Sequence, residues 1–353
     1  MRCLFWCVVF LFGFMPVCAY AYDGELSHYT AEILGNSDFV SFAERVVSGD
    51  GALAEGIAEK ILHLVIGDIK EISGYILSVL GFVILSSCIK GSQIKLGEGV
   101  SEVAFLVCYF VISSFLTAIL YKAVNLAIYS AEEIVGFIKM SLPAYIGIVT
   151  SMGINASAMQ TVFLVMINVV SGYAGSFMIN SFFYIGILGI VSNMSSRIHI
   201  TKLINIARQI LFWVLGFMLT VFAGMTSLSG LSVSASSATG IRAAKYTIGH
   251  AIPVVGGFLA DSTELILASA KIFRNTIGTA GIIALGALCM IPVIKLFVIG
   301  FLLKVSAGLT EPFCDKLMSE SIYSVGQTVV HIMVCVLLMT VMFIFAFAVL
   351  MNI

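Results

Sequence analysis

The chain has 353 residues, of which 60% are hydrophobic and only 10% are charged. Soluble domains carry charge on about a quarter of their residues, so most of this surface must face lipid rather than water. A formal net charge of −1 excludes a strongly basic, nucleic-acid-binding protein. We therefore expect an all-α, polytopic membrane protein with six or seven transmembrane helices plus amphipathic or re-entrant helices.

The N-terminus has the layout of a secretory signal peptide. One cation precedes an apolar run, and Ala19 and Ala21 place small residues at the two positions that a signal peptidase inspects. We expect cleavage before Tyr22, which makes 1–21 a signal peptide and puts the mature N-terminus outside the cytoplasm. The alternative is a first transmembrane helix that stays attached.

Residues 22–70 are the most water-tolerant part of the chain, because acidic and basic side chains recur along them. Apolar residues recur at helical spacing from Leu53 to Leu64, which predicts a helix with one apolar face. We interpret 22–70 as an extracytoplasmic amphipathic segment. Its helix is expected to lie on the outer membrane surface, to cover a partner, or to pack on the chain's own spans.

The remaining residues, 71–353, are predicted to form a multi-span membrane domain. A helix needs about 20 apolar residues to cross the hydrocarbon layer. The candidate spans are 72–89, 101–121, 207–228, 278–303 and 325–350.

A further apolar region, 160–194, is too long for one upright helix and short for two. Small and polar residues gather near its middle, namely Ser171, Gly172, Gly175, Ser176 and Asn180. They permit a tight hairpin, which we favour slightly and which gives seven spans, or a close helix–helix contact, which gives six. The lysines and arginines of the loops do not decide between the two.

Two segments between the spans are predicted to be amphipathic helices. In 123–142 polar residues step by three and four, and Pro143 is expected to end the helix. In 261–275 Asp261 is expected to cap the helix, with Glu264 reaching back to it. The polar face of this second helix is expected to meet the membrane interface, a partner subunit or an aqueous pore.

Residues 229–276 form an insert punctuated by glycine and proline, which let the backbone turn and approach another chain closely. Serines crowd 227–237 and predict a mobile or re-entrant linker. We expect 224–276 to form a re-entrant or interfacial hairpin at a partner contact, or alternatively a surface loop. The candidate assembly residues are Lys245, Tyr246, Gly249, Pro253, Gly256, Asp261 and Glu264.

The sequence shows none of the constellations typical of an enzyme. It contains no GxxxxGK[ST], HExxH or GxSxG pattern. We therefore expect no enzymatic activity, no cofactor and no metal ion. The five scattered histidines are expected to be satisfied or interfacial imidazoles, and the five cysteines beyond the signal peptide to be small core side chains.

Charged residues inside a bilayer are rare and usually functional. Lys295 lies in the run 278–303, three residues after Pro292. Pro292 is expected to break the helical ladder and to expose carbonyl groups that Lys295 meets. The alternative is that the lysine reaches the membrane interface along its own flexible stem.

Several stretches of the sequence resemble the stage III sporulation protein AE family of endospore-forming bacteria. They are "AAKYTIGHAIPVVGGFLADSTELILAS" (243–269), "IPVIKLF" (291–297) and "LTVFAGMTSLSG" (219–230). The resemblance is most specific over 205–300, and elsewhere it rests on the layout of signal peptide, outer polar segment and spans.

This resemblance implies a non-enzymatic membrane subunit of a channel or secretion-like complex that connects mother cell and forespore and is required for forespore development. The implied partners are other proteins of the same sporulation operon, a forespore membrane protein and lipid, with no nucleic acid. The implied location is the mother-cell membrane around the forespore. A stand-alone secondary transporter of a small solute is the alternative, because interrupted helices and an intramembrane lysine are typical of transporters.

Overall fold

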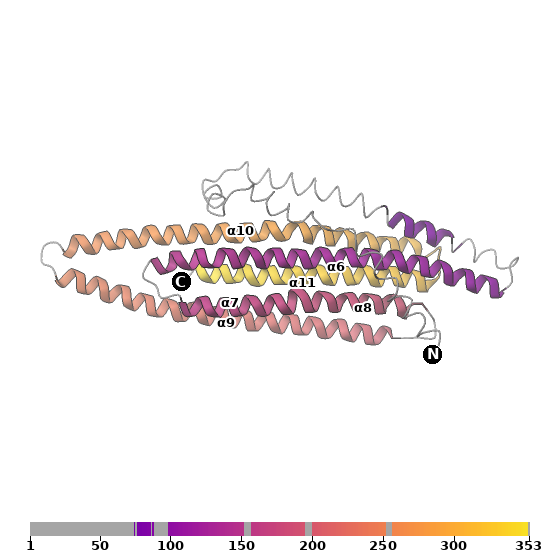
Figure 1. Ribbon diagram of the computed structural model, residues 1–353, viewed down its shortest axis with the longest axis horizontal. Helices are drawn as coiled ribbons and strands as arrows, with labels where there is room; N and C mark the ends of the chain where they lie inside the picture. The colour runs from indigo at the N-terminus through magenta and orange to yellow at the C-terminus, as the bar shows by residue number, and fades with distance from the viewer. Residues whose placement is uncertain are drawn as a thin grey trace.

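The computed structural model describes residues 76–85, 98–151, 157–194, 200–251 and 256–351, together with Gly74 and Ser87. Over these residues the regular structure is helical, and the long helices lie side by side along one axis (Figure 1). The all-α fold is therefore confirmed. The predicted signal peptide 1–21, the segment 22–70 and Pro253 lie outside the described residues.

Successive long helices of the bundle run antiparallel. They are α6 (Glu98–Ser151), the continuous helix made of α7 (Ser157–Val170), η2 (Ser171–Met178) and α8 (Ile179–Ser192), then α9 (Thr201–Ala251), α10 (Gly256–Thr310) and α11 (Lys316–Met351). The chain passes from α8 to α9 and from α10 to α11 at the same end of the bundle (Figure 1). We call this end, marked by Ser192, Thr201, Thr310 and Lys316, the turn end.

Five helical segments among the described residues are long and apolar enough to cross a membrane. They are Leu106–Gly147, Thr161–Ser192, Thr201–Leu228, Gly281–Thr310 and Lys316–Val349, and Ile76–Leu85 is a shorter apolar helix. Each of the predicted spans 101–121, 207–228, 278–303 and 325–350 overlaps one of the five. The polytopic membrane architecture is thereby confirmed.

The region 160–194 crosses the bundle as one continuous helix, so the favoured hairpin and its seventh span are wrong. In η2 the helix widens into π turns without reversing. A hairpin inside hydrocarbon would leave backbone groups unpaired, whereas a continuous helix pairs them internally. Of the small residues, Gly175 serves close packing: a Cβ there would lie 3.4 Å from the Cβ of Ala131 and 4.0 Å from the Sδ of Met339. Gly172, Ser176 and Asn180 are exposed.

Helix α6 joins the predicted span 101–121 and the amphipathic segment 123–142 into one helix. Pro143 lies inside α6 and does not end it, so that prediction is wrong. Proline is tolerated inside membrane helices because neighbouring groups satisfy the freed carbonyl. The predicted polar stripe does face outward, since Tyr129, Glu132, Gly136 and Lys139 are exposed.

Two boundary predictions fail in α9 and α10. The serine-rich segment 227–237 is helical within α9, so the predicted linker is wrong. The predicted helix 261–275 is helical, but α10 begins at Gly256, so Asp261 lies inside it and does not cap its start. That helix then runs into the apolar span 281–310 without a break, through Pro292.

Helices α9 and α10 form a hairpin that extends past the ends of α6 and α11 opposite the turn end (Figure 1). Their 51 and 55 residues correspond to about 77 and 83 Å of helix, against a hydrocarbon layer of about 30 Å. We call the parts beyond the apolar spans, 229–251 and 256–280, the arm.

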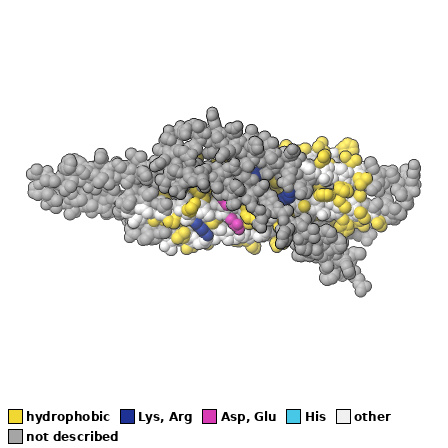
Figure 2. Space-filling model, turned by 45° about the horizontal axis from the view of Figure 1, so that its top comes forward, with side chains coloured by type: hydrophobic (Ala, Val, Ile, Leu, Met, Phe, Trp, Pro, Cys, Tyr) yellow, Lys and Arg dark blue, Asp and Glu magenta, His cyan; other side chains and the backbone are white. Residues whose placement is uncertain are grey.

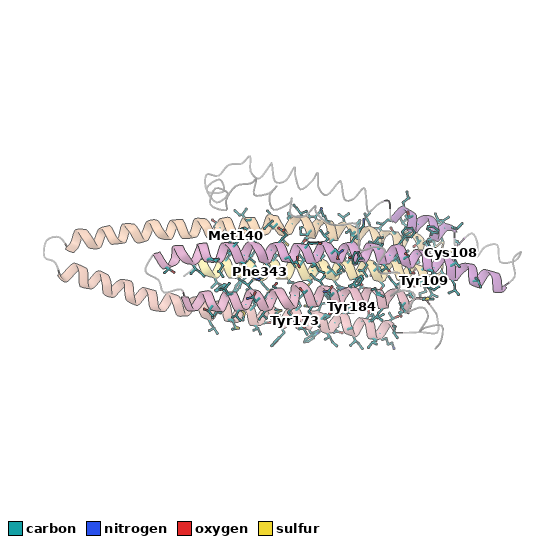
Figure 3. The ribbon with its side chains drawn as sticks, in the orientation of Figure 1. Cys108, Tyr109, Met140, Tyr173, Tyr184 and Phe343 are labelled. Atoms are coloured by element: carbon teal, nitrogen blue, oxygen red, sulfur yellow. The ribbon has the colours of Figure 1, made fainter. Side chains whose placement is uncertain are left out.

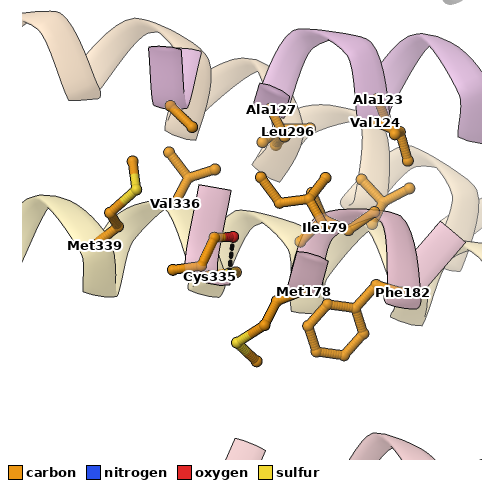
Figure 4. Close-up of a cluster of buried hydrophobic side chains, with 14 of the residues drawn as sticks. Ala123, Val124, Ala127, Met178, Ile179, Phe182, Leu296, Cys335, Val336 and Met339 are labelled. Atoms are coloured by element: carbon orange, nitrogen blue, oxygen red, sulfur yellow. Dashed lines mark hydrogen bonds between the residues drawn. The ribbon is translucent and has the colours of Figure 1, made fainter. Parts of the chain in front are cut away.

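The core of the bundle is built around α11 from apolar side chains that range in size from alanine to phenylalanine (Figures 3 and 4). Ala127, Ile179, Leu296 and Val336, from four different helices, belong to one buried cluster (Figure 4). Of the described free cysteines, Cys108, Cys289 and Cys335 are buried and Cys314 is partly exposed. The expectation of small core side chains is thus confirmed for three of them.

The outside of the bundle carries large apolar side chains, as a lipid-facing surface requires. Hydrophobic side chains dominate part of the described surface on the face in Figure 2, and charged ones are few there. On α9 the exposed set includes Leu203, Ile206, Ile210, Trp213 and Phe217. These residues recur every three or four positions, so they cover one side of a helix at the edge of the bundle.

Two facing glycines let α10 and α11 approach backbone to backbone. A Cβ on Gly300 would lie 2.7 Å from the Cγ2 of Val330 and 3.3 Å from the carbonyl oxygen of Gly326. A Cβ on Gly326 would lie 3.2 Å from the carbonyl oxygen of Gly300. Such contacts between small residues are a main source of helix association in lipid, where hydrophobic burial contributes little.

We predict that Gly300→Ala lowers the free energy of unfolding of the purified protein in detergent by roughly 1–3 kcal/mol, because the added methyl group forces the two helices apart. Gly286→Ala is the matched control on the same helix, since a Cβ there meets no atom within 4 Å. The control should be neutral or slightly stabilising, because alanine favours helix over glycine. Equal destabilisation by both variants would show that the α10–α11 contact is not as close as described.

Candidate functional site

A buried arginine joins α9 to α11 near the turn end. Arg208 is only 5% exposed although it lies in the apolar span of α9. Its Nη1 donates to Oε1 of Gln327 at 3.1 Å. Its Nη2 lies within donating distance of three acceptors: Oγ of Ser324 at 3.0 Å, the Ser324 carbonyl oxygen at 3.2 Å and Oγ1 of Thr328 at 3.0 Å.

Helix α8 is shaped to admit this group. A Cβ on Gly189 would lie 2.4 Å from Oγ of Ser324 and 3.9 Å from Nη2 of Arg208. Only glycine leaves room there, so α8 closes over the guanidinium while α11 supplies its acceptors. The four acceptors of this guanidinium among the described residues are neutral oxygens, so the cluster carries a net positive charge inside the span.

The acceptors belong to a polar track on α11. We use this name for Ser321, Ser324, Gln327, Thr328 and His331, which follow one another at helical spacing in the first half of this largely apolar helix. The track covers about 15 Å along the helix axis. It ends close to the midpoint of α11, beyond which Val336, Met339 and Phe343 are buried.

Tyr109 of α6 lies toward the turn end (Figure 3) and meets the track at its outer residue, Ser321. Its hydroxyl donates to the carbonyl oxygen of Ile190 at 2.6 Å and lies 2.8 Å from Oγ of Ser321. The side chain is 2% exposed. Tyr109 therefore ties α6 to α8 and α11 in the way that Arg208 ties α9 to α11.

His331 closes the inner end of the track. Its ring stacks on Phe182 with a centroid distance of 5.8 Å and meets the edge of Phe212 at 4.8 Å. Its Nδ1 is buried and has no hydrogen-bond partner in the part of the chain that the structure describes. Within the described ranges, two more buried side-chain atoms lack a partner: Nε of Arg208 and Oγ of Ser192.

The sequence contained a signal for this cluster that loop-charge reasoning misses. Arg208 stands at the start of an apolar run, where a basic residue is normally assigned to the cytoplasmic flank. The signal lies on α11, where polar residues recur every three or four positions in an apolar span. Such residues define a helix face that needs a polar neighbour.

The predicted assembly residues lie together on the arm. Lys245, Tyr246 and Gly249 are in the last turns of α9, and Gly256, Asp261 and Glu264 are in the first turns of α10. Because α9 ends at Ala251 and α10 begins at Gly256, these positions lie near the end of the molecule opposite the turn end (Figure 1).

Pro292 and Lys295 are not part of this group, since about 45 Å of α10 separates Lys295 from Glu264. Lys295 is 3% exposed. Its side chain thus lies inside the bundle and does not reach the membrane surface as the alternative interpretation expected. Pro292 is buried beside it within a continuous helix, so it does not interrupt α10.

We predict that Arg208→Lys lowers the free energy of unfolding in detergent by roughly 1–3 kcal/mol, because an ammonium group cannot reproduce the planar fork of hydrogen bonds. Lys202→Arg is the matched control, because it exchanges the same two residue types in the reverse direction, on the same helix, at an exposed position. The control should leave stability unchanged. An Arg208→Lys protein as stable as the wild type would mean that the fork does not hold α9 to the bundle.

Comparison with known proteins gives one consistent result. The family model of stage III sporulation protein AE matches residues 37–353. The chain is 26% identical to stage III sporulation protein AE of Bacillus subtilis (strain 168) over 285 residues, which cover 80% of this chain and 71% of that protein. No solved structure matches. The chain therefore belongs to the stage III sporulation protein AE family, and its role is in sporulation.

Proposed function

We propose that this chain is a non-enzymatic membrane subunit of a channel or secretion-like complex that connects mother cell and forespore and is required for forespore development. Family membership supports the sporulation role. The observation that carries the assembly role is the arm, in which α9 and α10 continue far beyond their apolar spans.

The arm offers a charged surface beyond the apolar, lipid-facing spans. Its two helices extend about 35 Å past the apolar spans, and they carry Arg242, Lys245, Asp261, Glu264 and Lys271. Charged side chains on helices outside the hydrocarbon layer can steer and orient a protein partner of complementary charge. The partners proposed are other proteins of the same sporulation operon and a forespore membrane protein.

The continuous helix over 160–194 also bears on the orientation of the arm. The five spans and the predicted span 72–89 together make six. With six spans and an N-terminus that is extracytoplasmic after signal cleavage, the turn end lies in the mother-cell cytoplasm. The arm then projects into the space between the mother-cell and forespore membranes. A forespore membrane protein is within reach of such an arm, whereas it cannot contact the turn end.

A stand-alone secondary transporter is the second candidate. It is favoured by two basic side chains buried within apolar spans, Lys295 and Arg208. Transporters place such groups on substrate or ion pathways. This candidate predicts that the purified chain alone moves a small solute across vesicles and that Lys295→Ala abolishes the movement.

The assembly role predicts that the arm contacts other sporulation proteins in cells. A photo-crosslinking phenylalanine analogue placed at Tyr246, on the arm, should capture proteins of the same operon during sporulation. The same analogue at Tyr184 is the matched control, because this tyrosine is 58% exposed on the lipid-facing side of α8. Crosslinked species are identified by mass spectrometry.

We expect protein adducts at position 246 that disappear when the other operon products are deleted. We expect no such adducts at position 184. Absence of adducts at 246, or identical adducts at both positions, would contradict an arm that docks to partners. Normal spores after deletion of the gene would contradict the role in forespore development.

A further inference from the structure

The partnerless polar atoms of the described residues belong to the three helices that meet at the Arg208 cluster. Nε of Arg208 is on α9, Nδ1 of His331 is on α11, and Oγ of Ser192 is on α8. Thr328, which accepts from Arg208, lies one helical turn before His331. Gly189, where an added Cβ would lie 3.9 Å from Nη2 of Arg208, lies one turn before Ser192. The three atoms thus flank one region of the bundle.

A buried guanidinium with an unpaired N–H is costly in a dry interior. Leaving a buried polar group without a hydrogen bond costs about 1–3 kcal/mol, and more when the group is charged. Internal water normally meets such groups when two to four polar partners surround it. Here a donor at Arg208, a hydroxyl at Ser192 and a ring nitrogen at His331 are polar groups with which water molecules can form hydrogen bonds.

The polar track supplies a route for this water from the turn end. Ser321 lies five residues into α11, and the polar side chains then recur to His331 near the middle of the helix. Beyond His331 the route stops, because Phe182 and Phe212 contact its ring and the next residues of α11, 332–339, are apolar.

We propose that water enters the bundle from the turn end along the polar track and hydrates Arg208 and His331, forming an aqueous vestibule closed by Phe182 and Phe212. The vestibule reaches about halfway through the membrane. Its positive guanidinium makes it attract small anions and repel small cations. The inference does not depend on the proposed assembly role, since it concerns the isolated chain.

Two threonines of α11 provide a matched pair to test this. Thr328 lies on the track and Thr340 lies beyond it; they are 0% and 2% exposed. Each donates its hydroxyl to the carbonyl oxygen four residues earlier, at 2.9 and 3.0 Å. Thr328→Cys and Thr340→Cys are made separately in the full chain without its native cysteines, and each protein is reconstituted in nanodiscs that leave both membrane faces accessible.

The measurement is the rate of modification by a hydrophilic, negatively charged methanethiosulfonate. Because thiols react through the thiolate, which needs water, the cysteine at 328 should react at least about tenfold faster than the one at 340. Ser324→Cys, a second position on the track, should react like the cysteine at 328. Equal rates at 328 and 340, whether slow or fast, would overturn the vestibule.

The charge of the vestibule is tested with the same proteins. Relative to their rates with a free thiol in solution, the negatively charged reagent should modify position 328 faster than a positively charged one. Arg208→Gln should remove most of that preference, because it removes the charge beside position 328. A preference for the positive reagent, or one unchanged by Arg208→Gln, would contradict a guanidinium-lined vestibule.

Discussion

Inside a bilayer no water is present to pair with backbone N–H and C=O groups, and the long helices of this protein follow from that constraint. A break in a helix at membrane depth would expose several such groups. The chain therefore stays helical through Pro143, through Pro292 and through the π turns of η2. The same continuity carries α9 and α10 out of their apolar spans and makes the arm an extension of the membrane helices.

An extension of this kind needs a firm base, and α9 is held only along one side. Its outer side is exposed at Trp213 and Phe217, while its inner side buries Leu215 and Phe222. Phe222 meets Phe343 of α11 edge-on, with ring centroids 6.1 Å apart. The Arg208 fork adds a directional contact to these apolar ones. Polar contacts of this type specify which face of a lipid-exposed helix points inward, which apolar packing alone does poorly.

The existence and order of the spans were predictable from the sequence, whereas their boundaries were not. Runs of about 20 apolar residues have few alternatives to a membrane helix. Pro143, Asp261 and the serines of 227–237 are reliable stop or start signals in soluble proteins, where water takes over the freed backbone groups. In this chain helix continues across all three, because the adjoining spans already fix the helical conformation on one side.

The candidate site was predictable only in part, for a related reason. The arm residues could be named because glycine, proline and charge stand out against an apolar background, as at Lys245 and Gly249. Arg208 could not, because its burial depends on Gly189 and on the polar face of α11, which are far away in sequence. Such a site becomes visible only when the three helices are placed together.

The central claim is that α9 leaves the membrane as an unbroken helix. Spin labels on Trp213→Cys and Lys245→Cys test it most directly, because the 32 residues between them cross the serine-rich segment. Pulsed electron paramagnetic resonance on the protein in nanodiscs should give one narrow distance near about 48 Å, the length of that many residues of helix. A chain that folds back into the bilayer would instead hold both labels within about 30 Å, the thickness of the hydrocarbon layer, and that result would contradict the account.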